Sequence, residues 1–215
     1  MIHIGDCLDV MKTIDPKSID AVVTDPPYGM SCNTNSFRFS GGKSPNINKK
    51  RGNGKAWPKI LNDDKPFDPS PWLQFPKVVM FGSNHFASRL PVGTSLVWIK
   101  KNEAAYGTFL SDAEIAWMKG GHGVYCFRHG NQNGKNRKHP TQKPVALMQW
   151  VIRKLKLKER ATILDPYCGS GSTGVAAIRE GFNFIGIELN PEYAAIAEAR
   201  IAAAKAEMPL LECVK

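Results

Sequence analysis

The sequence predicts an α/β fold, in which a mostly parallel central sheet is covered by helices on both faces. Short apolar runs alternate along the chain with segments of helical periodicity, the order typical of such a sheet. Several of the predicted strands lead into an acidic side chain, namely Asp6, Asp25, Asp165 and Glu188. In an open parallel sheet the carboxyl ends of the strands line one crevice, so we expect these acids to share a site.

The C-terminal third of the chain shows the alternation most clearly. A glycine-rich segment follows the apolar run 161–164 and has the composition of a tight turn between a strand and a helix. Gly181 ends the next helical segment, and Pro191 stands in the first turn of a longer one. We expect a strand over 161–164, a turn over 165–174, a helix over 175–180, a strand over 184–187 and a helix from 191 to about 207.

The rest of the chain continues the pattern. Apolar and β-branched residues dominate the run 19–24, which stands directly before Asp25. At 215 residues, the chain is expected to form a single domain over residues 1–215. In this part we expect strands over 1–4, 19–24, 78–81, 96–99 and 115–118, and a helix over 8–14.

The charge of the chain points to a polyanionic partner. Lys and Arg number 29 against 19 Asp and Glu, a formal net charge of +10, and nucleic acid is a common polyanion for so basic a protein. Residues 31–66 hold eight Lys or Arg against two acids, and residues 115–158 hold ten with no acid. One basic run is often only a solvated face, but two such runs favour a nucleic-acid surface.

Two segments are expected to form loops. Residues 31–66 are rich in Gly, Asn, Ser and Pro, which predicts a mobile basic loop, and residues 119–143 have a similar composition. Within these segments, the basic side chains expected to bind nucleic acid are Arg38, Lys49, Lys50, Arg51, Lys55, Arg128, Lys135, Arg137 and Lys138.

Cysteine spacing and hydropathy exclude several classes of protein. The five cysteines form no Cys-x-x-Cys pairs, so the sequence indicates neither a zinc site nor a disulfide framework, and we expect no metal. No apolar run approaches membrane-spanning length, and residues 1–6 lack the layout of a signal peptide. We therefore expect a cytoplasmic protein with no membrane partner.

The segment Asp25-Pro26-Pro27-Tyr28 has the chemistry to hold a planar base that carries an amine. Proline fixes φ and has no N–H, so the two prolines form a stiff loop whose carbonyls are free to accept hydrogen bonds. Asp25 adds a second acceptor, and Tyr28 supplies a stacking face. The alternative interpretation is an acidic loop that closes a strand, with Tyr28 partly in the core.

The glycine-rich turn predicts a nucleotide-type cofactor. Gly169-x-Gly171-x-x-Gly174, with Glu188 further on, matches the dinucleotide fingerprint, which taken alone would suggest NAD. However, Asp165 stands directly before the turn, where its carboxylate would repel a pyrophosphate. S-adenosylmethionine carries a sulfonium and an ammonium and no phosphate, so we prefer it to NAD.

Four motifs together resemble those of the S-adenosylmethionine-dependent DNA amino-methyltransferases of the permuted kind, in which the target-amine motif precedes the cofactor motif. They cover nearly the whole chain. In chain order they are Ile4-Gly5-Asp6-Cys7-Leu8, Asp25-Pro26-Pro27-Tyr28, His139-Pro140-Thr141-Gln142-Lys143-Pro144 and Leu164-Asp165-Pro166-Tyr167-Cys168-Gly169-Ser170-Gly171. The resemblance implies a Rossmann-like methyltransferase fold with a circularly permuted motif order. The N- and C-terminal strands would then be neighbours in one sheet.

The resemblance also implies roles for individual residues. Asp25, Pro26, Pro27 and Tyr28 would be catalytic. Asp165, Tyr167, Gly169 and Gly171 would hold the methionine end of the cofactor, with Thr141 and Gln142 closing over it. Glu188 would bind the ribose, and Asp6 and Cys7 would contact the adenine ring of the cofactor. Cys7 could instead be a core cysteine, and Thr141 a helix cap.

The reaction implied is direct transfer of a methyl group to the exocyclic N6 amine of adenine in DNA, with the base flipped out of the duplex. Carbon methylation of cytosine is excluded, because related enzymes use a cysteine after a proline and no Pro-Cys occurs here. Cytosine N4 stays open as an alternative target, and RNA or a protein glutamine as alternative substrates. From other classes, a silent nucleic-acid-binding module and an NAD-dependent oxidoreductase remain open.

Little of the chain is left for recognition of a DNA sequence. Only residues 119–138, as a small target-recognition segment, and the 31–66 loop are available for it. We expect a short or relaxed recognition sequence in double-stranded DNA, with many phosphate contacts. The sequence shows no nuclease segment, which favours a stand-alone methyltransferase of bacterial or phage origin.

Overall fold

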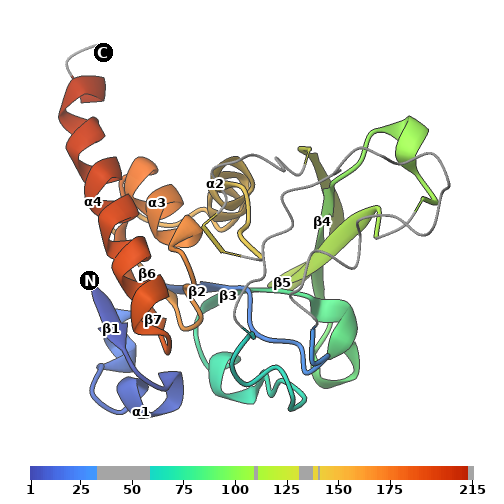
Figure 1. Cartoon of the computed structure of the whole chain (residues 1–215), viewed down its shortest axis with the longest axis horizontal. Coiled ribbons are helices and arrows are strands. Elements are labelled where there is room, and N and C mark those ends of the chain that lie inside the picture. Colours follow the sequence, from blue (N-terminus) through green and yellow to red (C-terminus); the bar gives the residue numbers. More distant parts are fainter. Residues whose placement is uncertain (33–58, 109–110, 131–137, 140, 213–215) are drawn as a thin grey trace, which may run out of the picture.

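The computed structural model describes residues 1–32, 59–108, 111–130, 138–139 and 141–212. A seven-stranded sheet runs through its centre in the order β1-β7-β6-β2-β3-β5-β4 (Figure 1). The strands are β1 (Ile2–Ile4), β2 (Ala21–Thr24), β3 (Lys77–Phe81), β4 (Gly93–Ile99), β5 (Ala113–Arg128), β6 (Thr162–Asp165) and β7 (Asn183–Glu188). The α-helices are α1 (Cys7–Met11), α2 (Val145–Lys154), α3 (Ser172–Arg179) and α4 (Pro191–Glu212). Single 3₁₀ turns occur over Pro16–Ser18, Ser70–Trp72, Ser83–His85, Ala87–Arg89 and Glu103–Ala105.

The strands from the two ends of the chain are interleaved. β1 pairs in parallel with β7, and β6 pairs in parallel with both β7 and β2. The α-amino group of Met1 donates to the Phe184 carbonyl at 3.0 Å. The predicted adjacency of the N- and C-terminal strands is therefore confirmed. Between β6 and β2 the order of the strands reverses, which is where open α/β sheets bind their ligands.

Helices cover both faces of the sheet, as predicted. In Figure 1, α2, α3 and α4 lie on one face, while α1 and short 3₁₀ turns lie on the other. Successive side chains of each strand point to opposite faces of the sheet, so they pack into two separate hydrophobic cores. Neighbouring residues of β2 illustrate this, because Val23 belongs to the core under α2, α3 and α4, whereas Val22 belongs to the core with Trp72 and Phe86.

The far end of the sheet differs from the prediction. Residues 94–99 of β4 lie opposite 118–113 of β5 in the reverse direction, and residues 95–99 also lie beside 124–128 in the same direction. The loop predicted over 119–143 is therefore wrong for 119–128, which belong to β5. The backbone of this glycine-rich segment pairs with β4. The composition of the segment does not show that a pairing strand is available. Residues 131–137 and 140 lie outside the described part of the chain.

The predicted helices differ mainly at their boundaries. α1 covers Cys7–Met11 instead of 8–14, and α3 begins at Ser172, three residues before the predicted start, because the turn closes at Gly171 with φ of +80°. α4 continues to Glu212. No bounds were predicted for α2, and its N-cap residue is Pro144 instead of Thr141. Among the described residues, no helix is long and apolar enough to cross a membrane. The loop predicted over 31–66 has its residues 33–58 outside the described part.

Candidate active site

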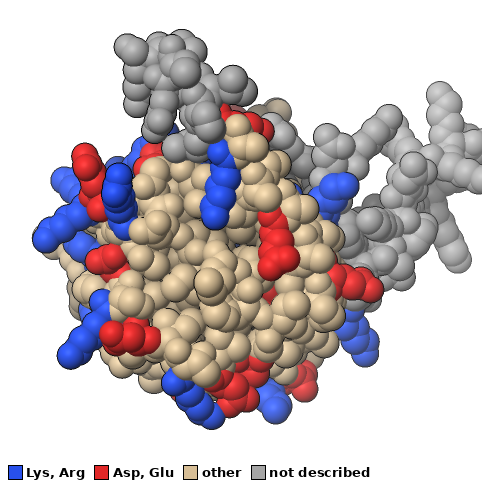
Figure 2. Space-filling model, turned by 90° about the vertical axis from the view of Figure 1, so that its left-hand side faces the viewer, with Lys and Arg blue, Asp and Glu red and all other residues tan. Residues whose placement is uncertain are grey.

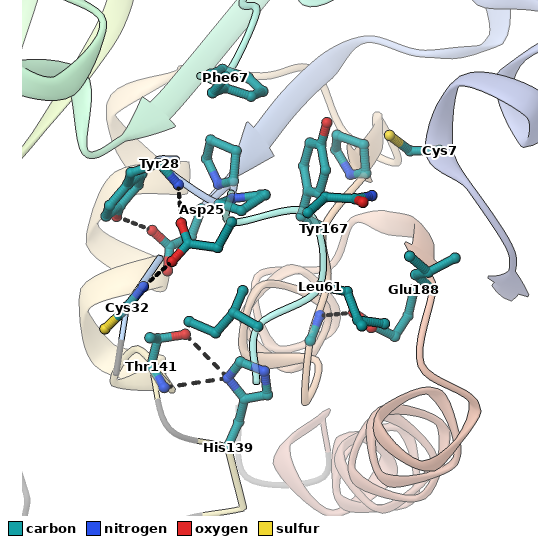
Figure 3. Close-up of a pocket in the computed structure, with 18 of the residues that line it drawn as sticks. Cys7, Asp25, Tyr28, Cys32, Leu61, Phe67, His139, Thr141, Tyr167 and Glu188 are labelled. Carbon is teal, nitrogen blue, oxygen red and sulfur yellow. Dashed lines mark hydrogen bonds between the residues drawn. The ribbon is translucent and has the colours of Figure 1, made fainter. Parts of the chain in front are cut away.

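One large cavity lies at the carboxyl ends of the central strands (Figure 3). Its volume is about 800 Å³, within the range typical of ligand pockets. It is lined by side chains from the ends of four strands, including Asp6 after β1, Asp25 after β2, Tyr167 after β6 and Glu188 at the end of β7. In Figure 3, Asp25 and Glu188 lie on opposite sides of this cavity.

The carboxylate of Asp25 is held by two side chains. Lys143 donates from Nζ to Oδ2 at 2.5 Å, and the hydroxyl of Tyr28 donates to Oδ1. Asp25 is 18% exposed and Lys143 is 7% exposed, so this ion pair is largely withdrawn from water. Pro26 and Pro27 line the same cavity. Each oxygen of the carboxylate keeps capacity for a further hydrogen bond from a ligand.

Lys143 links Asp25 to a second carboxylate. Its Nζ lies 3.1 Å from Oε2 of Glu114, and Oε1 of Glu114 accepts from Nζ of Lys100 at 3.0 Å. The four side chains form a row of alternating charge from the cavity into β5 and β4, and its formal net charge is zero. A buried row of this kind is tolerated because each charge has an opposite neighbour.

The pKa values in this row follow from burial and pairing. Burial raises the pKa of Asp25 above its usual value, and Lys143 opposes that rise. Burial alone would lower the pKa of Lys143, but Asp25 and Glu114 outweigh it and raise the pKa well above the usual value. For Glu114, burial is outweighed by Lys143 and Lys100, which lower its pKa to about 2. We infer that Asp25 and Lys143 form an ion pair at neutral pH.

The ring of Tyr28 is fixed by its surroundings. It stacks on His85, with ring centroids 4.8 Å apart and planes 13° apart. A Cβ atom on Gly82 would lie 2.0 Å from Cε1 of Tyr28, so only glycine leaves room for the ring there. Burial, followed by the charge of Asp25, raises the pKa of the Tyr28 hydroxyl well above its usual value. The hydroxyl therefore acts as a donor to Asp25 throughout the physiological range.

Asp165 lies at the end of β6 but is turned into the protein. It is 2% exposed, and its carboxylate accepts from the hydroxyls of Thr24 at 2.8 Å and Thr173 at 2.6 Å. The backbone N–H of Tyr167 donates to it as well, at 3.1 Å. Burial raises the pKa of Asp165 to about 6, although these hydrogen bonds oppose the rise. It lines a small cavity of about 50 Å³ that also contacts Asp25.

Glu188 is oriented by backbone donors. Oε2 accepts from the N–H of Gly169 at 2.8 Å, and Oε1 accepts from the N–H of Asn190 at 2.9 Å. The carboxylate thus joins the glycine-rich turn to the start of α4, and it lines the cavity. Burial raises the pKa of Glu188 above its usual value.

The remaining residues predicted for the cofactor fall into two groups. Asp6 caps α1 by accepting from the N–H of Leu8 at 2.9 Å, and Cys7 is buried beside it. Tyr167 lies near Cys7, with its ring edge-on to Phe67 and Trp72. All three predicted residues line the cavity. The structure therefore places Tyr167 beside Asp6 and Cys7.

The segment before α2 covers a different part of the cavity. Thr141 bonds to Nδ1 of His139 through its hydroxyl at 3.1 Å, and Gln142 accepts from the backbone N–H of Lys138 at 2.9 Å. Thr141 and Gln142 line the cavity, as Figure 3 shows for Thr141. Gln142 also accepts from the hydroxyl of Ser170 at 3.4 Å, which ties this segment to the glycine-rich turn.

The glycines of the turn serve different purposes. Gly169 lines the cavity with φ of +51°. Gly171 instead faces α4, where a Cβ atom would lie 2.9 Å from Cβ of Ala197. A Cβ atom on Gly174 would lie 2.5 Å from Cδ1 of Ile201. Close packing of α3 and α4 thus accounts for the second and third glycines of the fingerprint.

Most of the residues predicted to bind nucleic acid lie outside the described part of the chain, namely Arg38, Lys49, Lys50, Arg51, Lys55, Lys135 and Arg137. Arg128 bonds to Glu103 at 3.3 Å and to the hydroxyl of Tyr106 at 3.1 Å. Lys138 lies directly before the segment that covers the cavity. The face on the α4 side carries charges of both signs around an uncharged centre, so the basic excess is not gathered there (Figure 2).

Comparison with known proteins finds DNA methyltransferases. The family model described as DNA methylase matches residues 118–199. The type II methyltransferase M2.DpnII of Streptococcus pneumoniae is 29% identical over 94% of this chain and 89% of its own length. M2.LlaDCHI of Lactococcus lactis is 26% identical over 94% of this chain and 88% of its own length.

The chain is similar to DNA methylases over residues 118–199 and to type II DNA methyltransferases over most of its length.

Solved structures support the fold. The M1.HpyAVI–SAM complex has a TM-score of 0.61 at 24% identity, and covers 93% of this chain and 98% of its own. PvuII DNA methyltransferase, described as cytosine-N4-specific, has a TM-score of 0.58 at 16% identity, over 96% and 91% of the two chains. The predicted Rossmann-like methyltransferase fold is confirmed.

Sequence reasoning missed three charged residues that line this cavity: Lys143, Glu114 and Asp63. Lys143 stands inside a motif that was recognised, so its place beside Thr141 and Gln142 was the available signal. Glu114 directly precedes an apolar run, as an ordinary surface residue also could. Asp63 lies in an irregular segment where no periodicity marks it. Within the described residues, no group of three or more His, Cys, Asp or Glu could hold a metal ion.

Proposed function

We propose that this protein transfers a methyl group from S-adenosylmethionine to the N6 amine of adenine in DNA. The observation that carries the proposal is the composition of one cavity. The acceptor Asp25, which the rigid Pro26 follows in the chain, lies on one side of it, and the acid Glu188 lies on the other. One side suits a base with an exocyclic amine, and the other suits a nucleoside cofactor.

The residues of the cofactor side fit S-adenosylmethionine. Each oxygen of Glu188 accepts one backbone hydrogen bond, Oε2 from Gly169 and Oε1 from Asn190. Each oxygen keeps a further lone pair that can accept from a ribose hydroxyl. Asp6 and Cys7 form a partly apolar wall suited to an adenine ring. No cluster of basic side chains lies at the described part of the glycine-rich turn on the cavity side, whereas a pyrophosphate favours cationic partners. When bound, this cofactor supplies a methyl group activated by the sulfonium.

Asp25 and Pro26 act on the amine. The nitrogen lone pair of adenine N6 is delocalised into the ring, so the amine is a poor nucleophile. Hydrogen bonds from its two N–H groups to the Asp25 carboxylate and the Pro26 carbonyl localise that lone pair on nitrogen. The N–C bond forms as the C–S bond breaks, and the amine then loses one proton. Because the amine becomes acidic only after it is methylated, a carboxylate suffices to accept that proton.

Lys143 keeps Asp25 in the state this reaction needs. The ionised carboxylate is the stronger acceptor for the amine N–H, and burial favours the protonated form of Asp25. The ammonium of Lys143, 2.5 Å from Oδ2, opposes that protonation. Tyr28 holds the other oxygen and contributes a ring for stacking of a flipped base on the face that His85 does not cover.

The substrate is DNA, and we propose the double-stranded form. The net charge of +10 supports a phosphate-dominated interaction. Residues 31–66 and 119–138 remain our proposal for the segments that contact DNA. Binding of this kind weakens steeply as salt increases, and a flat salt response would count against it. Cytosine N4 is the second target the site accommodates, since it presents the same kind of amine.

The test uses purified protein, labelled S-adenosylmethionine and unmethylated double-stranded DNA, followed by digestion and identification of the modified nucleoside. We expect N6-methyladenine from the wild type and at least a roughly 10²-fold loss with Asp25→Ala, which removes the acceptor of the amine. Asp9→Ala is the matched control, because Asp9 is an exposed acid that pairs only with Lys12 in the described structure.

Each outcome has a separate meaning. N4-methylcytosine in place of methyladenine would keep the mechanism and overturn the target base. Absence of any DNA product, with cofactor binding retained, would overturn the proposed substrate in favour of RNA, protein or a silent binding module. Binding of NAD in place of S-adenosylmethionine would overturn the proposed cofactor.

A further inference from the structure

Asp63 is a buried acid that none of the steps above uses. It is 5% exposed and lies in the turn 61–64, and its segment lines the cavity. Its carboxylate accepts four backbone N–H groups from another part of the chain. The donors are Tyr28 at 3.0 Å, Gly29 at 2.9 Å and Met30 at 3.2 Å to Oδ1, and Cys32 at 2.6 Å to Oδ2.

The position of these donors explains why they converge on one carboxylate. Pro26 and Pro27 have no N–H, so Tyr28, Gly29 and Met30 supply the first three successive N–H groups after Asp25. Successive N–H groups that point to one side form a concave site for an anion. Without an acceptor, donors so close to a partly buried cavity would remain unsatisfied, which is unfavourable.

The backbone of the two segments meets at a second point. The N–H of Ser31 donates to the carbonyl of Asp63 at 2.6 Å. Gly29, with φ of +76°, lies so close to the carbonyl of Lys65 that a Cβ atom there would be 2.5 Å from that oxygen. The side chain and the main chain of the 61–65 segment thus fix residues 28–32 together.

We propose that Asp63 is a positioning residue for the catalytic loop, which it holds through backbone N–H groups and not through contact with substrate. The proposal rests on the proposed methyl transfer, because its consequence is a correctly placed Tyr28, Asp25 and Pro26 carbonyl. Tyr28 is bound at both ends, its N–H by Asp63 and its hydroxyl by Asp25. Loss of Asp63 frees the first of these ends and shifts the acceptors relative to the amine.

The first experiment compares Asp63→Asn with Asp64→Asn. Asp64 is the adjacent, exposed acid, so both changes remove one charge from the same turn. We expect Asp63→Asn to lower kcat at least about 10-fold, while the Kd for S-adenosylmethionine changes less than about 3-fold. Asp64→Asn is expected to leave both values unchanged. An unchanged kcat in a folded Asp63→Asn protein overturns the proposal.

A second experiment refills the anion site. Asp63→Ala leaves the N–H groups without their carboxylate, and formate is a small carboxylate that fits such a site. We expect formate to raise the kcat of Asp63→Ala at least about 3-fold and to leave Asp64→Ala unaffected. A response to formate that is equal in the two variants overturns the proposal.

A third measurement needs no variant and no activity. In the wild type, the amides of Tyr28, Gly29, Met30 and Cys32 are expected to be protected from hydrogen exchange. Free exchange at these four amides overturns the role of Asp63, whatever the reaction is. If the amides are protected but the protein does not methylate DNA, the role of Asp63 in holding the loop stands and only the proposed function is rejected.

Discussion

Lys143 and Asp25 are 118 positions apart in the chain, yet Nζ of Lys143 lies 2.5 Å from Oδ2 of Asp25 at the carboxyl end of β2. The pair joins the segment that carries Thr141 and Gln142 to the proposed acceptor of the target amine. Lys143 directly follows Thr141 and Gln142, so a shift of that segment also moves the cation that keeps Asp25 ionised. The two halves of the site are therefore electrostatically coupled.

Removal of Lys143 is expected to move the acid limb of the pH–rate profile upward. Without the ammonium, burial and the charge of Glu114 raise the pKa of Asp25 further, so the ionised form is lost at a higher pH. For Lys143→Met we expect kcat/KM at pH 6 to fall at least about 10-fold, with recovery toward pH 9. The measurement is kcat/KM from pH 5 to 9.5. Lys158→Met, an exposed lysine, serves as control, and an acid limb at the wild-type pH would refute the expectation.

The row of charges predicts strong coupling in stability between Lys143 and Glu114. Lys143→Met leaves two largely buried carboxylates without their shared cation, and we expect a loss of roughly 3–5 kcal/mol in the free energy of unfolding. Adding Glu114→Gln removes one of these charges and should recover at least about 1 kcal/mol. Urea unfolding of the wild type, both single variants and the double variant gives the coupling. Strict additivity of the two changes would show that the charges act independently.

Because Asp165 is buried, we expect the free energy of unfolding to fall as the pH rises. Its pKa in the folded protein is raised by burial to about 6, so the folded state binds this proton more tightly than the unfolded state does. Protonation then favours folding, and its contribution is lost between about pH 4 and pH 6. Relative to Asp165→Asn, the wild type should lose roughly 2 kcal/mol between pH 4 and pH 7. Unfolding curves at four pH values test this, and parallel curves for the two proteins would contradict it.

Alanine substitutions at Gly171 and Gly181 distinguish the cost of backbone strain from the cost of a packing clash. Both have φ of +80°, so alanine is strained at either position. At Gly171 the new Cβ would also lie 2.9 Å from Cβ of Ala197, whereas at Gly181 nothing lies within 4 Å. We expect Gly181→Ala to cost about 1 kcal/mol and Gly171→Ala at least about 1 kcal/mol more. Thermal unfolding of both variants checks the difference, and equal losses would show that α4 yields to the added methyl group.

The sequence predicted the strands of the cavity and the acids at their ends because both depend on local patterns. The runs before Asp25 and Asp165 are apolar and short, and the parallel arrangement brings their carboxyl ends together. Lys143 was missed as a partner of Asp25 because the contact joins distant segments, and no local pattern encodes it. The second half of β5 was missed for a related reason, since its hydrogen-bond partners belong to β4.

The interleaving of strands also determines when the cavity can form during synthesis. Asp6 follows β1, but within the described residues β1 pairs only with β7, and β2 obtains one of its two neighbours from β6. A nascent chain that has not yet emerged past Glu188 has neither that acid of the cavity nor the strand that holds β1 in place. The cavity can therefore be completed only after β7 has been made.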